Sequence, residues 1–205
     1  MATSEQTVQK ADGIPFDPRL ARLAVTAIFF TNGALVANWF ARIPDVKHQL
    51  GLSEGSFSLA LLCMAVGALI AQPATGVLIG KYGSRRMTSI MALVFCATVT
   101  LIGFASSLPL LMLVLFFVGA ANGSLDVSMN AQAAMVERNY GRSIMNSFHA
   151  LWSVGGLIGA AVGGLIASRG VTVDVHFVAA AAVAAVLMLL ALRGLLPDGP
   201  SRAGH

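Results

Sequence analysis

The 205-residue chain is 57% apolar and only 11% charged, whereas a soluble domain carries roughly 25% charged residues. This composition excludes an ordinary soluble enzyme and predicts an integral membrane protein. The net charge of +4 does not predict nucleic-acid binding, because the cations are segregated by their position between the apolar segments.

Residues 1–18 are polar and lack the basic start and short apolar run of a signal peptide. We therefore expect a cytoplasmic tail followed by a retained membrane helix. About 20 residues of helix cross a ~30 Å hydrocarbon core, where the backbone must satisfy its own hydrogen bonds. We predict an all-α integral membrane protein with a bundle over residues 19–196 and a breaker-rich cytoplasmic linker beginning at 197–205. Its six membrane helices are expected at residues 20–40, 57–79, 87–105, 109–134, 144–167 and 175–196.

The distribution of the basic residues predicts the topology of these segments. Ten of the thirteen fall on the side of the N-terminus and three on the other side. Cytoplasmic loops carry the excess of Lys and Arg in membrane proteins, so we expect both termini to be cytoplasmic. The ten are Lys10, Arg19, Arg22, Lys81, Arg85, Arg86, Arg138, Arg142, Arg193 and Arg202, and the three are Arg42, Lys47 and Arg169.

A weak internal repeat relates the two halves of the chain. Residues 76–83 align with residues 163–170 at an offset of 87, with four of eight positions identical. The same offset carries the start of the first segment onto the start of the fourth. We therefore predict a three-plus-three repeat, over about residues 20–106 and 107–196, as in known transporter halves. Chance matching of glycine-rich membrane sequence is the alternative.

The loop after the second segment, residues 76–86, carries glycines and cations at a fixed spacing. It resembles the signature G-x-L-x-D-[RK]-x-G-[RK]-[RK] of the major facilitator superfamily, although Gly80 replaces the acid and Ser84 replaces a basic residue. The resemblance implies the N-terminal half of a major facilitator fold, with a gating role for this loop. The missing acid removes the carboxylate that latches the loop in the family. The resemblance assigns the gating role to Gly76, Lys81, Gly83, Arg85 and Arg86. The alternative is that the cations only determine the membrane topology.

Asp126 is the only carboxylate inside any of the six apolar segments. A charged side chain at the centre of a membrane helix costs about 2.5–3.5 kcal/mol on insertion scales, so such residues tend to be functional. Asn122 and Asn130 lie four residues to either side and share its helix face. Desolvation disfavours the ionised carboxylate, so we expect a group that a proton gradient loads and unloads. A structural hydrogen bond to another helix, with the acid permanently protonated, is the alternative.

Residues 125–137 and 141–156 resemble a branch of bacterial sugar permeases that includes fucose–proton symporters and rhizopine-transporter-like proteins. The resemblance implies that Asp126 is a protonation site, with Asn130 completing an acid–x–x–x–Asn motif. That branch also has an acid in its first helix, where this chain has none. The resemblance further implies the bacterial inner membrane as location and a sugar or polyol as solute.

Other polar and aromatic residues inside the segments are candidates for the solute pathway. Asn32 and Asn38 lie in the first segment, which the repeat makes equivalent to the segment of Asp126. His149 and Trp152 share one face of the fifth segment. Trp152 offers a stacking surface for a sugar ring, and His149 is a proton partner for Asp126 if their helices face each other. Helix–helix hydrogen bonding and packing are the alternatives for this pair.

The sequence thus predicts proton-coupled symport of a small hydrophilic solute rather than an enzyme activity, since no metal, nucleotide or nucleophile motif is present and no cofactor is expected. An efflux antiporter is one alternative, because the glycines at 155, 159 and 163 partly resemble an antiporter element, although close helix packing explains their spacing better. A truncated fragment or accessory subunit is another.

The expected partners are lipid and a second six-helix half, either a C-terminal half or a homodimer partner. The candidate residues are Asp126 and His149 for the proton and Asn32, Asn38, Asn122, Asn130 and Trp152 for the solute.

Overall fold

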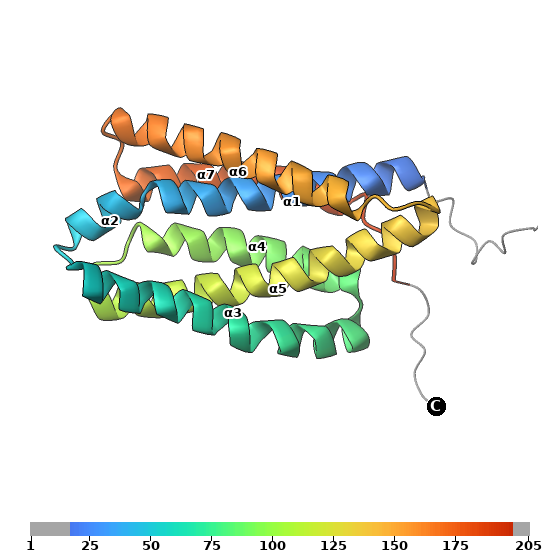
Figure 1. Cartoon of the computed structure of the whole chain (residues 1–205), viewed down its shortest axis with the longest axis horizontal. Helices are drawn as coiled ribbons and strands as arrows, with labels where there is room; N and C mark the ends of the chain where they lie inside the picture. The colour runs from blue at the N-terminus through green and yellow to red at the C-terminus, as the bar shows by residue number, and fades with distance from the viewer. Residues whose placement is uncertain (1–16, 199–205) are drawn as a thin grey trace, which may run out of the picture.

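The computed structural model of the chain describes residues 17–198, so most of the predicted polar tail and of the predicted linker lies outside the described residues. This part of the chain is entirely helical (Figure 1). Within residues 17–198, six helices are long and apolar enough to cross a membrane. They are α1 (Pro18–Ala41), α3 (Glu54–Tyr82), α4 (Ser84–Ile102), α5 (Leu108–Tyr140), α6 (Met145–Ser168) and α7 (Val173–Leu192). The predicted fold class and the six spans are confirmed.

The structure differs from the prediction in one added helix and in two helices that are longer than expected. A short helix, α2 (Ile43–Gln49), follows α1 almost directly. It was not predicted, but Pro44 in its first turn and Asp45 beside it are residues that favour a helix start. Helices α3 and α5 have 29 and 33 residues, about six and seven more than expected, because both continue past the apolar segments into residues such as Glu54 and Arg138.

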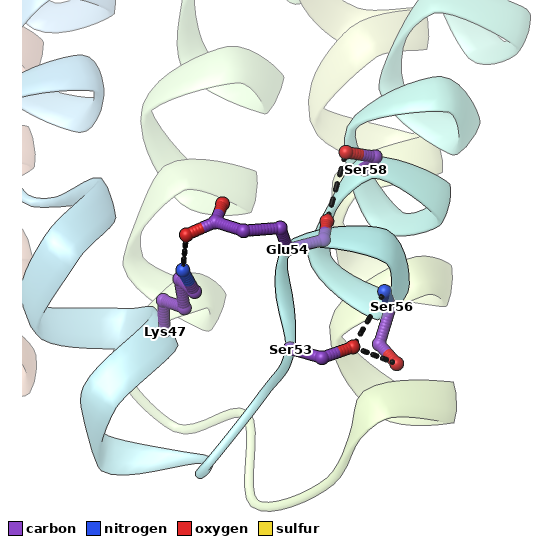
Figure 2. Close-up of polar contacts among 5 residues, drawn as sticks. All are labelled: Lys47, Ser53, Glu54, Ser56 and Ser58. Atoms are coloured by element: carbon purple, nitrogen blue, oxygen red, sulfur yellow. Dashed lines mark hydrogen bonds and ion pairs between the residues drawn. The ribbon is translucent and has the colours of Figure 1, made fainter.

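Local signals in the sequence explain where the helices begin and end. The Ser53 hydroxyl accepts a hydrogen bond from the Ser56 backbone N–H at 3.2 Å, which caps the N-terminus of α3 as its sequence predicts (Figure 2). Next to this cap, Lys47 of α2 pairs with Glu54 and so ties α2 to α3. At the other end of α3, Gly83 has a φ of +84° and separates α3 from α4 with a single residue.

Two helix pairs pack with their backbones in close approach. Between α1 and α6, a Cβ placed on Gly155 would lie 2.1 Å from the backbone oxygen of Phe30. Between α3 and α5, a Cβ placed on Gly67 would lie 2.0 Å from the backbone oxygen of Phe116. Only glycine fits at such positions, and small residues commonly allow this approach in membrane helices. The α6 glycines at 155, 159 and 163 thus pack against α1, as expected of their spacing.

The helix pairs of the bundle correspond between its first three membrane helices and its last three. Helix α1 packs against α6 and α7, while α5 packs against α3 and α4. Exchanging α1, α3 and α4 with α5, α6 and α7 leaves this set of pairs unchanged, as the predicted repeat would require. Helices α1 and α5 are central and well buried, whereas α3 and α6 lie on opposite flanks and expose apolar side chains (Figure 1).

Candidate functional site

The central polar feature of the bundle is a hydrogen-bonded chain across three helices. The indole Nε1 of Trp152 on α6 donates to Asn32 Oδ1 on α1 at 2.9 Å. Asn32 Nδ2 donates in turn to Asn122 Oδ1 on α5 at 2.8 Å. Asn32 is only 2% exposed, whereas Trp152 is 37% exposed. Three residues predicted from separate segments therefore meet in one network, which has a buried centre and an accessible edge.

Asp126 lies one turn along α5 from this network. Asn130 Nδ2 donates to the Asp126 carboxylate at 3.1 Å and to its backbone oxygen at 2.9 Å. Both side chains are half-buried, as is that of Asn122. Because α5 is continuous through these positions, the three residues form the stripe that their spacing predicts. We call Asn32, Asn122, Asp126, Asn130 and Trp152 the central cluster.

His149 lies near this cluster but makes a different contact. Its ring stands edge-on to Phe29 of α1, with ring centroids 5.3 Å apart and an interplanar angle of 87°. The residue is exposed. His149 therefore packs on α1, and no hydrogen bond or ion pair of the described residues joins it to Asp126, so proton exchange between the two stays a prediction.

Asn38 does not join the central cluster. Its amide donates to the Ala34 backbone oxygen at 2.8 Å, and its Oδ1 lies 2.9 Å from His176 Nε2 on α7. Asn38 and His176 are 7% and 2% exposed. They line a cavity of about 450 Å³ whose lining residues come from α1, α6, α7 and the α6–α7 loop, with none from α5. This cavity is therefore separate from the stripe that contains Asp126.

A buried arginine lies between the Asn38–His176 pair and α2. Arg42 is 3% exposed, donates to the Val171 backbone oxygen at 2.7 Å, and places its Nε 2.8 Å from the Asp45 carboxylate. Together, Asn38, Arg42, Asp45 and His176 form what we call the α2-end cluster. Sequence reasoning did not single out His176, although it is one of only two histidines inside the six spans, which is a signal that could have identified it.

The α3–α4 turn, predicted as a gating loop, has two of its three cations beside one aromatic ring. Lys81 Nζ lies 5.1 Å and Arg86 Cζ lies 5.8 Å from the centre of the Tyr82 ring, within the range of cation–π contacts. A Cβ placed on Gly76 would meet no atom within 4 Å, so this glycine makes no close approach within the described residues. Gly83 forms the turn itself.

Two residues that the sequence did not assign also reach this turn. Asp198 accepts hydrogen bonds from the backbone N–H groups of Ser84 and Arg85. Gln132 of α5, which is fully buried, donates to the Ser84 hydroxyl at 2.9 Å. No local signal identifies either residue, because both contacts join positions far apart in the chain.

Comparisons with known proteins agree with this fold. Residues 23–205 match the family model of the Major Facilitator Superfamily. The chain is 42% identical over 158 residues to an uncharacterized transporter of Sinorhizobium fredii, an alignment that covers 77% of this chain and 42% of that protein. It is 34% identical over 202 residues to an uncharacterized MFS-type transporter of Yersinia pestis, covering 96% of this chain and 51% of that protein. It is also 35% identical over 179 residues to the membrane protein MosC of Rhizobium meliloti, covering 86% and 42%.

A crystal structure of the nucleoside transporter NupG, carrying the D323A mutation, is similar in fold, with a TM-score of 0.73 at 17% sequence identity. That alignment covers 88% of this chain and 45% of the transporter. These likenesses are to transporters and to a membrane protein, and not to enzymes. The chain spans about half the length of the curated relatives it matches. With a family match over residues 23–205 and a six-span helical bundle, the chain belongs to the Major Facilitator Superfamily.

Proposed function

We propose that this chain is the N-terminal half of a proton-coupled transporter for a small hydroxylated solute, such as a sugar or polyol, and that Asp126 binds the proton. The observation that carries the proposal is the position of Asp126. It is half-buried, held by Asn130, and one helical turn from the network of Asn32, Asn122 and Trp152. A carboxylate in this setting is next to groups suited to bind a polar solute.

The proton role rests on the cost of charge within the membrane. An ionised carboxylate at this depth is expensive, and protonation removes the charge. Asn130 orients Asp126 through its own helix, so the carboxylate needs no partner on another helix to keep its position. His149, on the next helix along the chain, is the candidate for exchanging a proton with it.

The solute role rests on the mixture of groups in the central cluster. Asn122 and Asn130 each carry an amide that can both donate and accept hydrogen bonds. Trp152 adds a partly exposed ring whose orientation is fixed by its hydrogen bond to Asn32. A flat apolar ring face beside amides matches a sugar, which has C–H groups on one face and hydroxyl groups around its edge. Asn38 stays a sequence prediction, and its bond to His176 supports a structural role.

A second six-helix half is part of the proposal. Relatives are about twice as long as this chain, and substrate sites in this type of transporter lie at the interface of repeats near the bilayer midplane. The flanking helices α3 and α6 expose leucines such as Leu69 and Leu157, which the second half and lipid would cover. We place the protein in the bacterial inner membrane with both termini in the cytoplasm, following the distribution of its basic residues.

The test is transport by the complete two-half protein in proteoliposomes with an imposed pH gradient. Sugars, polyols and a cationic dye are screened first, and the accepted solute is then used with Asp126→Asn. We expect this variant to lose gradient-driven accumulation while retaining solute exchange, because the neutral amide resembles the protonated acid. Asp45→Asn, which changes an acid of the α2-end cluster, is the matched control and should accumulate solute normally. Accumulation by Asp126→Asn at the wild-type level would refute the proton role, and uptake of the dye alone would refute the solute class.

A further inference from the structure

Residues 194–198, which follow α7, pack against the bundle. Leu195 and Leu196 are 3% and 4% exposed, so their side chains are packed within the protein. A Cβ on Gly194 would lie 2.9 Å from the Ala24 side chain, which places this segment against the first turns of α1. Residues 194–198 therefore bridge the beginning of α1 and the α3–α4 turn.

Gln132 binds the backbone of this segment from inside the bundle. Its Oε1 accepts from the Leu196 N–H at 3.2 Å, and its Nε2 donates to the Leu196 carbonyl oxygen at 3.2 Å. The same Nε2 donates to the Ser84 hydroxyl at 2.9 Å. Gln132 is fully buried, so these partners satisfy a polar side chain that would otherwise be costly to bury.

Asp198 binds the N-terminus of α4 from the other side of the turn. Its Oδ1 accepts from the Ser84 N–H at 2.6 Å and from the Ser84 hydroxyl at 2.9 Å, while its Oδ2 accepts from the Arg85 N–H at 3.1 Å. A carboxylate is favoured at a helix N-terminus, where the free N–H groups and the helix dipole attract negative charge. A Cβ on Gly83 would lie 2.1 Å from Asp198 Oδ2. Gly83 thus provides the space for the carboxylate as well as the backbone conformation of the turn.

We propose that Gln132, Ser84 and Asp198 form a clamp that fixes the segment after α7 to the α3–α4 turn, with Asp198 as the residue that positions this turn. Ser84 is the shared element, because its hydroxyl contacts both Gln132 and Asp198. The turn has no acid of its own at Gly80, and Asp198 supplies a carboxylate to it from a distant part of the chain. Gln132 lies six residues beyond Asp126, or about 9 Å along α5, so the clamp anchors the helix that carries the central cluster.

The clamp is tested by backbone amide hydrogen exchange of the 205-residue chain in lipid nanodiscs, which requires no transport. Asp198→Ala should speed exchange of the Ser84 and Arg85 amides about tenfold or more, because charge-assisted hydrogen bonds are lost. If the clamp is one unit, the same variant also speeds exchange at Leu196, and Gln132→Leu speeds exchange at Ser84 and Arg85 as well as at Leu196. Asp198→Asn, which keeps size but loses charge, should give a smaller effect at the same three amides.

Matched controls exist for both variants. Asp17→Asn removes the charge of an acid that caps another helix by accepting from the Arg19 N–H. Asn139→Leu removes an α5 amide that bonds only within its own helix among the described residues. Neither control should change exchange at Ser84, Arg85 or Leu196. The proposal is overturned if Asp198→Ala leaves Leu196 unchanged or if Gln132→Leu leaves Ser84 and Arg85 unchanged, because each residue would then act only on its nearest neighbour. Since exchange is read from the folded chain, failure here leaves the proposed transport function standing.

Discussion

The two polar clusters of the bundle each contain an asparagine of α1, but the two asparagines bond to different helices. Asn32 and Asn38 both lie on α1 and both are almost fully buried. Asn32 joins α5 and α6 in a cluster with accessible members, whereas Asn38 bonds to His176 of α7 and lines a separate cavity with it. Six residues along an α-helix rotate the side chain by about 120° to a different face. The comparison shows that the face of α1 on which an asparagine lies, and not its burial alone, decides whether it joins the central cluster or the α2-end cluster.

The largest expected effect comes from separating α1 from α6. Gly155→Leu places a side chain where a Cβ alone would lie 2.1 Å from the Phe30 backbone oxygen. We expect a loss of about 3 kcal/mol in stability, at the upper end of the cost of overpacking. The variant should break the Trp152–Asn32 bond and leave Asn38–His176 intact, because the latter joins α1 to α7. Unfolding by denaturant in mixed micelles measures the loss, and indole fluorescence reports on Trp152 together with the buried Trp39.

Gly164→Leu is the control for this variant, since a Cβ on Gly164 meets no atom within 4 Å. Its side chain enters open space, so stability should stay within about 0.5 kcal/mol of the wild-type value. Equal losses from the two substitutions would show that close approach of α1 and α6 does not hold the central cluster together.

The second-largest expected effect comes from variants that test whether the α2-end cluster is purely structural. Asn38→Leu leaves the His176 ring without its partner, and we expect a loss of about 2 kcal/mol in stability. The double variant with His176→Phe removes both polar groups, so it should recover most of that loss. Transport by the complete protein should follow stability alone. A double-mutant cycle on unfolding free energy gives the coupling, and a selective rise in KM for the Asn38 variant would instead place Asn38 in the solute site.

The smallest expected effect on stability belongs to Trp152. Trp152→Phe keeps an aromatic ring but removes the hydrogen bond to Asn32, and we expect a cost of about 1 kcal/mol. Because the free ring can rotate, solute affinity should fall by more than stability does. Binding of the accepted solute, measured by calorimetry beside thermal unfolding, separates these quantities. Unchanged affinity would remove Trp152 from the proposed solute site.

Much of the fold could be predicted because membrane helices are determined by local composition. The six spans follow from runs of apolar residues, and the stripe of Asn122, Asp126 and Asn130 follows from helical periodicity alone. Helix α2 was missed because seven residues carry too little periodic signal. The pairing of Asn38 with His176 was missed because the sequence does not state which helix faces which side of α1.

The sequence by itself determined that this chain forms apolar membrane-spanning helices, that one of them carries a lone carboxylate between two amides, and that the cations lie at the helix ends and in the connecting turns. Each of these properties depends on residues close together in the chain. The tertiary structure alone decided that Asn32 meets Asn122 and Trp152, that Asn38 does not, and that Gln132 and Asp198 hold the α3–α4 turn. These contacts join residues 48 to 138 positions apart. They depend on which helix faces pack against each other. Glycines permit the close approach of two helices, but the neighbouring residues in the sequence do not specify which helix is the partner.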